Sequence, residues 1–120
     1  MTAFDHEKLD AYNVTIQALA FGVQVARGIP REDSFLRNQL LRALTSMCFN
    51  LAEGSGEFSA GDKVRFFRMS RRSASESAAI TDALRILGYV KQETARELKN
   101  LLSRATAMLT RMIQSRRTPP

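Results

Sequence analysis

Residues 34–54 read SFLRNQLLRALTSMCFNLAEG, and this stretch decides the fold class. Its large apolar residues recur at intervals of three or four positions. They are Leu36, Leu40, Leu44, Met47 and Leu51. This spacing places one apolar stripe along one side of an α-helix. The stretch has no proline, and its single glycine stands at its end, so we expect one unbroken helix here.

The same periodicity extends outward to the rest of the chain. It recurs over residues 4–26, 60–87 and 92–114. No segment sustains the alternating pattern of a half-buried strand. We therefore expect four helices and no sheet.

Glycine and proline mark the connections between these helices. The breaks fall at residues 27–31, 54–61 and 88–90. Ser59, followed three residues later by Asp62, predicts a capping box at the start of the third helix. Gly54 and Gly88 predict left-handed caps at the ends of the second and third helices.

Short connections force consecutive helices to run antiparallel. The predicted fold is therefore all-α: an antiparallel, up-down-up-down four-helix bundle. We expect a single domain over residues 1–115, because 120 residues suit one domain. Residues 116–120 read RRTPP, and we expect them to form a disordered tail.

The composition limits the classes of function that the chain can have. The single cysteine, Cys48, excludes a disulfide or a cysteine metal cluster within one chain, and the single histidine, His6, argues against a histidine metal site or catalytic triad. No apolar run approaches the roughly 20 residues of a membrane span, and the start of the chain lacks the pattern of a secretory signal. We expect a cytoplasmic protein without metal or cofactor, and not an enzyme.

The helix over residues 4–26 has two apolar stripes. The first is Leu9, Tyr12, Ile16, Leu19, Val23 and Ala26, which we expect to face the core. The second is Val14, Ala18, Phe21 and Val25, on nearly the opposite side. A helix in a monomeric bundle needs one buried face. The second stripe therefore predicts an interface with another copy of the chain, although a broad core face with a few exposed apolar residues remains the alternative.

Basic residues exceed acidic ones by 18 to 12, and 14 of the basic residues are arginines. The densest group is Arg65, Arg68, Arg71 and Arg72 on the third helix. Arginines on a rigid helix can contact a phosphate backbone, which supplies most non-specific affinity for nucleic acids. The alternatives are a solvated face, ion pairs between subunits, or an acidic protein partner.

A second set of polar residues lies on or near apolar stripes. On the second helix these are Arg42, Ser46, Asn50 and Glu53, and on the third helix they are Ser73 and Glu76. A buried carboxylate needs a hydrogen-bonding partner. The set predicts a polar network that supports packing. A small functional site with Glu53 and Glu76 as an acid–base pair is the alternative, although nothing nearby supplies a nucleophile or a cofactor loop.

Several of these positions together resemble a known family. They include Ser46, then residues 50–54 (NLAEG), residues 65–68 (RFFR), Ser73, Glu76 and residues 87–90 (LGYV). The S-x-x-x-N-x-A-E-G pattern at the end of the second helix is intact. In these segments the chain is similar to the bacterial four-helix-bundle family, also called the 23S rRNA intervening-sequence protein family.

The resemblance covers about residues 8–114. It implies a homopentamer of antiparallel bundles and carries over no catalytic residues. It also suggests kinship with the accessory variability proteins of diversity-generating retroelements, which are basic pentamers that bind nucleic acid and a reverse transcriptase. The chain departs from the family at Arg71, Arg72 and Lys91, and each departure adds positive charge. We therefore expect a non-enzymatic oligomer that binds RNA or DNA, with a protein-interaction scaffold as the alternative.

Overall fold

A computed structural model describes residues 4–116. A short 3-10 helix, η1 (Asp5–Lys8), precedes α1 (Asp10–Arg27), and a second, η2 (Arg31–Asp33), leads into α2 (Ser34–Gly56). The chain continues through α3 (Ala60–Ile86) and α4 (Gln92–Ser115). The predicted helix over residues 4–26 begins later than expected, because Leu9 is extended and separates η1 from α1.

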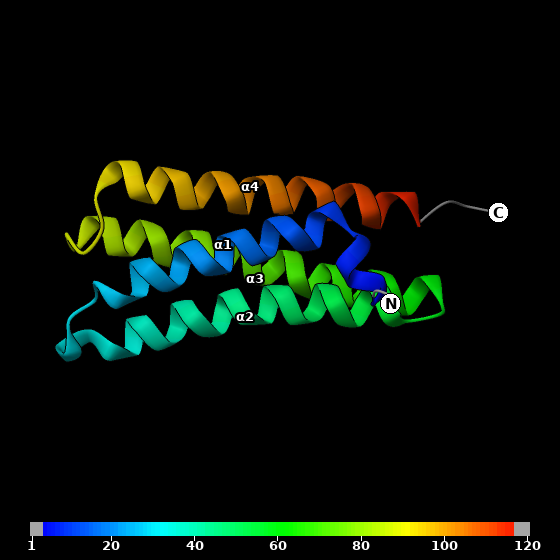
Figure 1. Ribbon diagram of the computed structural model, residues 1–120, viewed down its shortest axis with the longest axis horizontal. Helices are drawn as coiled ribbons and strands as arrows, with labels where there is room; N and C mark the ends of the chain where they lie inside the picture. The colour runs from blue at the N-terminus through cyan, green and yellow to red at the C-terminus, as the bar shows by residue number, and fades with distance from the viewer. Residues whose placement is uncertain (1–3, 117–120) are drawn as a thin grey trace.

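The four long helices run side by side along a molecule of 51 × 34 × 22 Å (Figure 1). Each helix packs against its neighbours in the chain, and α1 closes the bundle against α4. The α1–α2 and α3–α4 connections lie at one end, and the α2–α3 connection lies at the other (Figure 1). The predicted antiparallel, up-down-up-down bundle is confirmed.

Of the sequence signals at helix ends, the Ser59 cap and the left-handed turn at Gly88 are confirmed, and the cap at Gly54 is wrong. The Asp62 amide donates to Ser59 Oγ at 3.1 Å at the start of α3. Gly88, just after α3, has a positive φ of 83°, which glycine adopts without strain. Gly54 does not end α2, because the helix continues to Gly56. Gly54 is buried instead, and a Cβ there would come within 2.7 Å of the Phe67 ring. Its function is to let α3 approach α2 closely.

The core face of α1 is broad, as the alternative interpretation had it, and it is centred on the stripe that was assigned to an oligomer interface. Val14, Ala18 and Val25 are buried in this chain, and Phe21 packs partly buried against the same core. These residues were predicted to form an oligomer interface, and that assignment is wrong because the bundle itself covers them. The predicted core stripe is half-buried along most of its length, and its central Ile16 is 39% exposed.

The core face of α3 includes Ser73 but not Glu76, although both were predicted to lie on or near its apolar stripe. Small polar side chains, including Ser70, Ser77 and Thr81, are fully buried there. Ser70 Oγ donates to the Met47 carbonyl across the α2–α3 contact at 2.7 Å. Ser77 and Thr81 donate to carbonyls one turn earlier in their own helix. Small side chains bring the helices close together, and each buried hydroxyl is satisfied.

Cys48 lies in the core, as expected of a small buried hydrophobic residue. Its thiol contacts the Thr15 carbonyl at 3.4 Å. Burial raises the pKa of the Cys48 thiol, while the hydrogen bond to Thr15 opposes that rise. Within residues 4–116, no helix is long and apolar enough to cross a bilayer.

Candidate nucleic-acid interface

The arginine cluster lies on the first half of α3. Ser59 caps this helix, and Phe67 anchors the segment in the core at 1% exposure. The arginines are therefore held on a rigid helix rather than on a loop. Arg65, Arg68 and Arg72 are exposed, and Arg71 is half-buried toward α4.

Three of the four arginines line a hollow of about 250 Å³ between α3 and α4. They are Arg68, Arg71 and Arg72, and the other lining residues are Ser75 and Thr106. The prediction grouped Arg65 with Arg68 and Arg72 and placed Arg71 at the flank of this face. The structure instead brings Arg71 into the hollow and leaves Arg65 outside it.

Arg71 is held in place by α4. Its Nη1 donates to Thr110 Oγ1 at 3.2 Å. A guanidinium has five N–H donors in a planar fork, so this bond leaves others available for a ligand. Because Arg71 is also half-buried, it has less freedom to lose on binding an anion than an unrestrained surface arginine.

Arg65 is engaged elsewhere. Its guanidinium lies over the Phe66 ring, 4.6 Å from the centroid, and forms a loose ion pair with Asp62 at 4.0 Å. Both partners of this pair are more than half exposed, so the pair contributes little to stability. Its charge is partly compensated locally, unlike that of the three arginines in the hollow.

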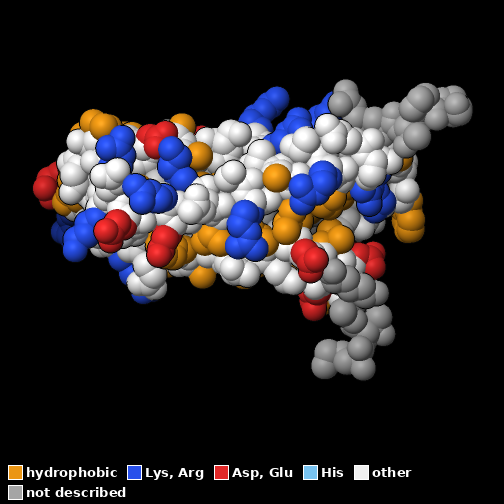
Figure 2. Space-filling model, turned by 90° about the horizontal axis from the view of Figure 1, so that it is seen from above, with side chains coloured by type: hydrophobic (Ala, Val, Ile, Leu, Met, Phe, Trp, Pro, Cys, Tyr) orange, Lys and Arg blue, Asp and Glu red, His pale blue; other side chains and the backbone are white. Residues whose placement is uncertain are grey.

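The charge of the hollow is uncompensated within its own lining. None of its lining residues is acidic. A second hollow, at the other end of the α3–α4 groove, contains Asp82 paired with Lys99 at 2.8 Å. Figure 2 looks onto the face that carries α4. The middle of this face carries basic side chains and no visible acidic ones, and the acidic side chains gather toward the two ends.

The predicted polar network is smaller than expected. Ser46 Oγ and Ser73 Oγ lie 2.9 Å apart and join α2 to α3. Asn50 Nδ2 donates to both the carbonyl and the Oγ of Ser46, at 2.9 and 3.0 Å. These three residues form one network, as the packing interpretation predicted.

The three charged members of that set lie outside the network. Arg42, Glu53 and Glu76 are exposed on the surfaces of α2 and α3. The expectation of a buried carboxylate at Glu76 is wrong, because the buried side of α3 carries Ser70 and Ser77 and leaves Glu76 exposed. Among residues 4–116, no group of three or more His, Cys, Asp or Glu side chains could hold a metal ion.

Arg116 was predicted to belong to the tail, but it is in contact with the bundle. Arg116 lies over the Phe67 ring at 5.4 Å, and its Nη1 donates to the Met112 carbonyl at 3.0 Å. Arg116 is therefore packed against the bundle. Residues 117–120 lie outside the described part of the chain.

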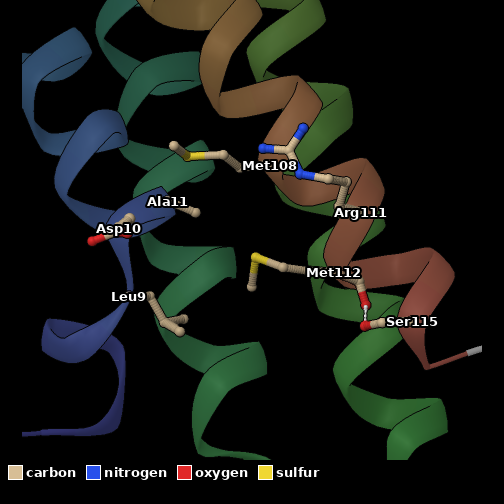
Figure 3. Close-up of a pocket in the computed structure, with 7 residues that line it drawn as sticks. All are labelled: Leu9, Asp10, Ala11, Met108, Arg111, Met112 and Ser115. Atoms are coloured by element: carbon tan, nitrogen blue, oxygen red, sulfur yellow. Dashed lines mark hydrogen bonds between the residues drawn. The ribbon is translucent and has the colours of Figure 1, made fainter.

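An apolar pocket of about 430 Å³ lies between the start of α1 and the end of α4. Leu9 approaches it from one side, and Met108 and Met112 approach it from α4 (Figure 3). Hydrophobic side chains also gather in a band along the molecule in Figure 2. On the outer side of α1, Ile16 is also exposed.

The sequence did not indicate that Ser75, Thr106 and Thr110 are neighbours of the arginines. Thr106 and Thr110 are four residues apart, so they lie on one edge of α4. That spacing was visible in the sequence. Their position opposite Arg71 depends on the register between α3 and α4, which the sequence does not supply.

The model of the 23S rRNA-intervening sequence protein family matches residues 7–111. The chain belongs to this family. The match spans all of α1, α2 and α3 and most of α4, so it includes every residue of the arginine hollow.

A solved structure supports the fold of this 23S rRNA-intervening sequence protein family member. It is a protein of unknown function from the S23 ribosomal protein family of Bacteroides thetaiotaomicron. It is 18% identical with a TM-score of 0.80, and the match covers 87% of this chain and 98% of the other. At this identity the likeness concerns the fold alone. No curated protein matches the chain.

Proposed function

We propose that this protein is a non-enzymatic, oligomeric nucleic-acid-binding protein whose arginine-rich surface on α3 contacts the phosphates of RNA. The observation that carries the proposal is the hollow that Arg68, Arg71 and Arg72 line without a carboxylate among its lining residues. Arginine forks match phosphate oxygens, and neutralising phosphates releases counterions. The name of the family favours RNA over DNA as the ligand.

A binding role accounts for the polar residues better than catalysis does. Glu53 and Glu76, the candidate acid–base pair, are exposed and lie outside the Ser46–Asn50–Ser73 network. The buried core thiol of Cys48 is packed away from solvent. We place the protein in the cytoplasm, where a free thiol stays reduced.

We also propose that the protein assembles into a homo-oligomer, with five subunits as the family resemblance implies. The apolar outer side of α1 and the adjoining pocket supply a surface for a second copy. A closed ring repeats the arginine hollow once per subunit. Repetition along one nucleic-acid strand raises the overall affinity without any new contact within a subunit.

The test is a titration of labelled single-stranded RNA, and of DNA of the same sequence, at several salt concentrations. We expect the affinity to fall steeply as salt rises. The double variant Arg68→Gln/Arg72→Gln should bind more weakly. The salt slope is the slope of the logarithm of the binding constant against the logarithm of the salt concentration. Each lost phosphate contact should reduce its magnitude by about 0.7 for a single strand.

The matched control is Arg27→Gln/Arg31→Gln, which removes the same charge from exposed positions at the α1–α2 end of the bundle. This control should keep most of the salt slope. Absence of RNA and DNA binding at low salt would overturn the proposal. The arginine surface would then belong to a protein-interaction scaffold with an acidic partner, and a reverse transcriptase would be one partner to test.

A further inference from the structure

The arginine hollow carries more charge than one internal phosphate requires. A phosphodiester carries a single negative charge, and three arginines are among the residues that line the hollow. A terminal phosphate monoester carries about −1.5 to −2 at pH 7 and presents three acceptor oxygens. The larger charge and the additional oxygens of a monoester match a set of three arginines better than a diester does.

The size of the hollow also favours a terminal phosphate group as the ligand. Pockets for whole small molecules are usually about 300–1,000 Å³. At about 250 Å³, this hollow suits one functional group rather than a nucleobase with its sugar. Its lining also lacks an aromatic residue on which a base could stack.

The lining divides into fixed and adaptable donors. Arg71 is fixed by Thr110, whereas Arg68 and Arg72 are exposed and can close on a ligand from the solvent side. The Ser75 hydroxyl adds one neutral donor. The Thr106 hydroxyl donates to the Leu102 carbonyl at 2.9 Å, so it can only accept.

We propose that the α3–α4 hollow of Arg68, Arg71 and Arg72 binds the terminal phosphate monoester of an RNA strand. This inference rests on the proposed function, since it specifies the RNA group that the arginine surface recognises. Internal phosphates then contact the more exposed basic side chains outside the hollow. The terminal phosphate can come from either the 5′ or the 3′ end, because the recognised chemistry is the same.

The experiment compares three forms of one internally labelled single-stranded RNA: hydroxyl at both ends, 5′-phosphate, and 3′-phosphate. We expect at least one phosphorylated form to bind the wild-type protein about tenfold more tightly than the hydroxyl form, the size of one added charge-assisted hydrogen bond. The form that gains affinity identifies the end that is bound.

Two variants test whether the preference for a phosphorylated strand depends on the hollow. Arg71→Gln should abolish the preference for the phosphorylated strand while retaining weak binding of the hydroxyl form. Arg65→Gln removes the same charge outside the hollow and should keep the preference. Circular dichroism melting of both variants checks that the bundle remains folded.

The two proposals fail differently. Equal affinity of the wild type for all three RNA forms would overturn the terminal-phosphate site and leave RNA binding intact. A preference that persists in Arg71→Gln and disappears in Arg65→Gln would also overturn it. No binding of any form at low salt would overturn the proposed function, and the terminal-phosphate site with it.

Discussion

At the scale of single residues, Tyr89 and Asp33 tie together the two connections at one end of the bundle. Tyr89 follows α3, and Asp33 ends η2 just before α2. The Tyr89 hydroxyl donates to Asp33 Oδ2. This hydrogen bond, followed by burial and the nearby carboxylates, raises the pKa of Tyr89 above its usual value of 10.0.

The raised pKa predicts a pH-dependent contribution to stability. A folded-state pKa above the unfolded one stabilises the fold fully below the unfolded pKa, and the contribution disappears as pH rises through the folded pKa. We expect Tyr89→Phe to melt at a lower temperature than the wild type between pH 7 and 9. The difference should shrink above pH 10. Thermal melting of both proteins across this range measures it.

A melting difference that stays constant up to pH 11 would show that the Tyr89 proton contributes nothing. Asp33→Ala serves as the companion variant, because it removes the acceptor and leaves the tyrosine. Its melting temperature should lose the same pH-dependent contribution as that of Tyr89→Phe, since either change breaks the same hydrogen bond.

At the scale of helices, the α2–α3 contact depends on the absence of a side chain at Gly54. A Cβ at this position would lie 2.7 and 2.8 Å from two ring atoms of the buried Phe67. We expect Gly54→Ala to destabilise the protein by about 1–3 kcal/mol, which is typical of overpacking in a core. Urea unfolding followed by circular dichroism measures the change.

Gly56 provides the matched control two residues further along α2. It is exposed, and a Cβ there would meet no atom within 4 Å. Gly56→Ala should be neutral or slightly stabilising, by up to about 1 kcal/mol, because alanine restricts the unfolded chain. Equal unfolding midpoints for the two variants would contradict the proposed close approach.

At the scale of the whole molecule, the outer side of α1 is where we expect subunits to meet. Ile16 is 39% exposed at the centre of this side, between the half-buried Tyr12 and Leu19. We expect the wild type to be a homo-oligomer at micromolar concentration. Ile16→Glu should yield smaller species, because a charge would be placed in an apolar interface. Multi-angle light scattering measures the mass.

Gln17→Glu introduces the same charge at the neighbouring exposed position and should leave the mass unchanged. A monomeric wild type would overturn the oligomer. If Ile16→Glu keeps the wild-type mass, the interface lies elsewhere. The exposed Phe49 and Met69 on α2 and α3 would then be the next positions to substitute.

Much of the architecture could be predicted from the sequence. Leu40, Leu44 and Leu51 have the spacing that a helix needs to bury one side, and all three are fully buried. The capping hydroxyl of Ser59 and the positive φ of Gly88 were also predicted. These features depend on residues close together in the chain, so the sequence by itself determined the helices, their order and the basic character of α3.

Only the tertiary structure decided which helix faces are inside and which side chains meet. The periodicity of a sequence shows which residues share one side of a helix, but not which side is buried. On α1 the choice is open, because apolar residues lie on two sides. Val14 and Ala18 face the core rather than Ile16, and Ser70 faces it rather than Glu76. Close helix packing favours small buried residues, and the α3–α4 register brings Thr110 to Arg71. Both depend on how whole helices fit together, because residues far apart in the chain must satisfy their packing and hydrogen bonds at the same time.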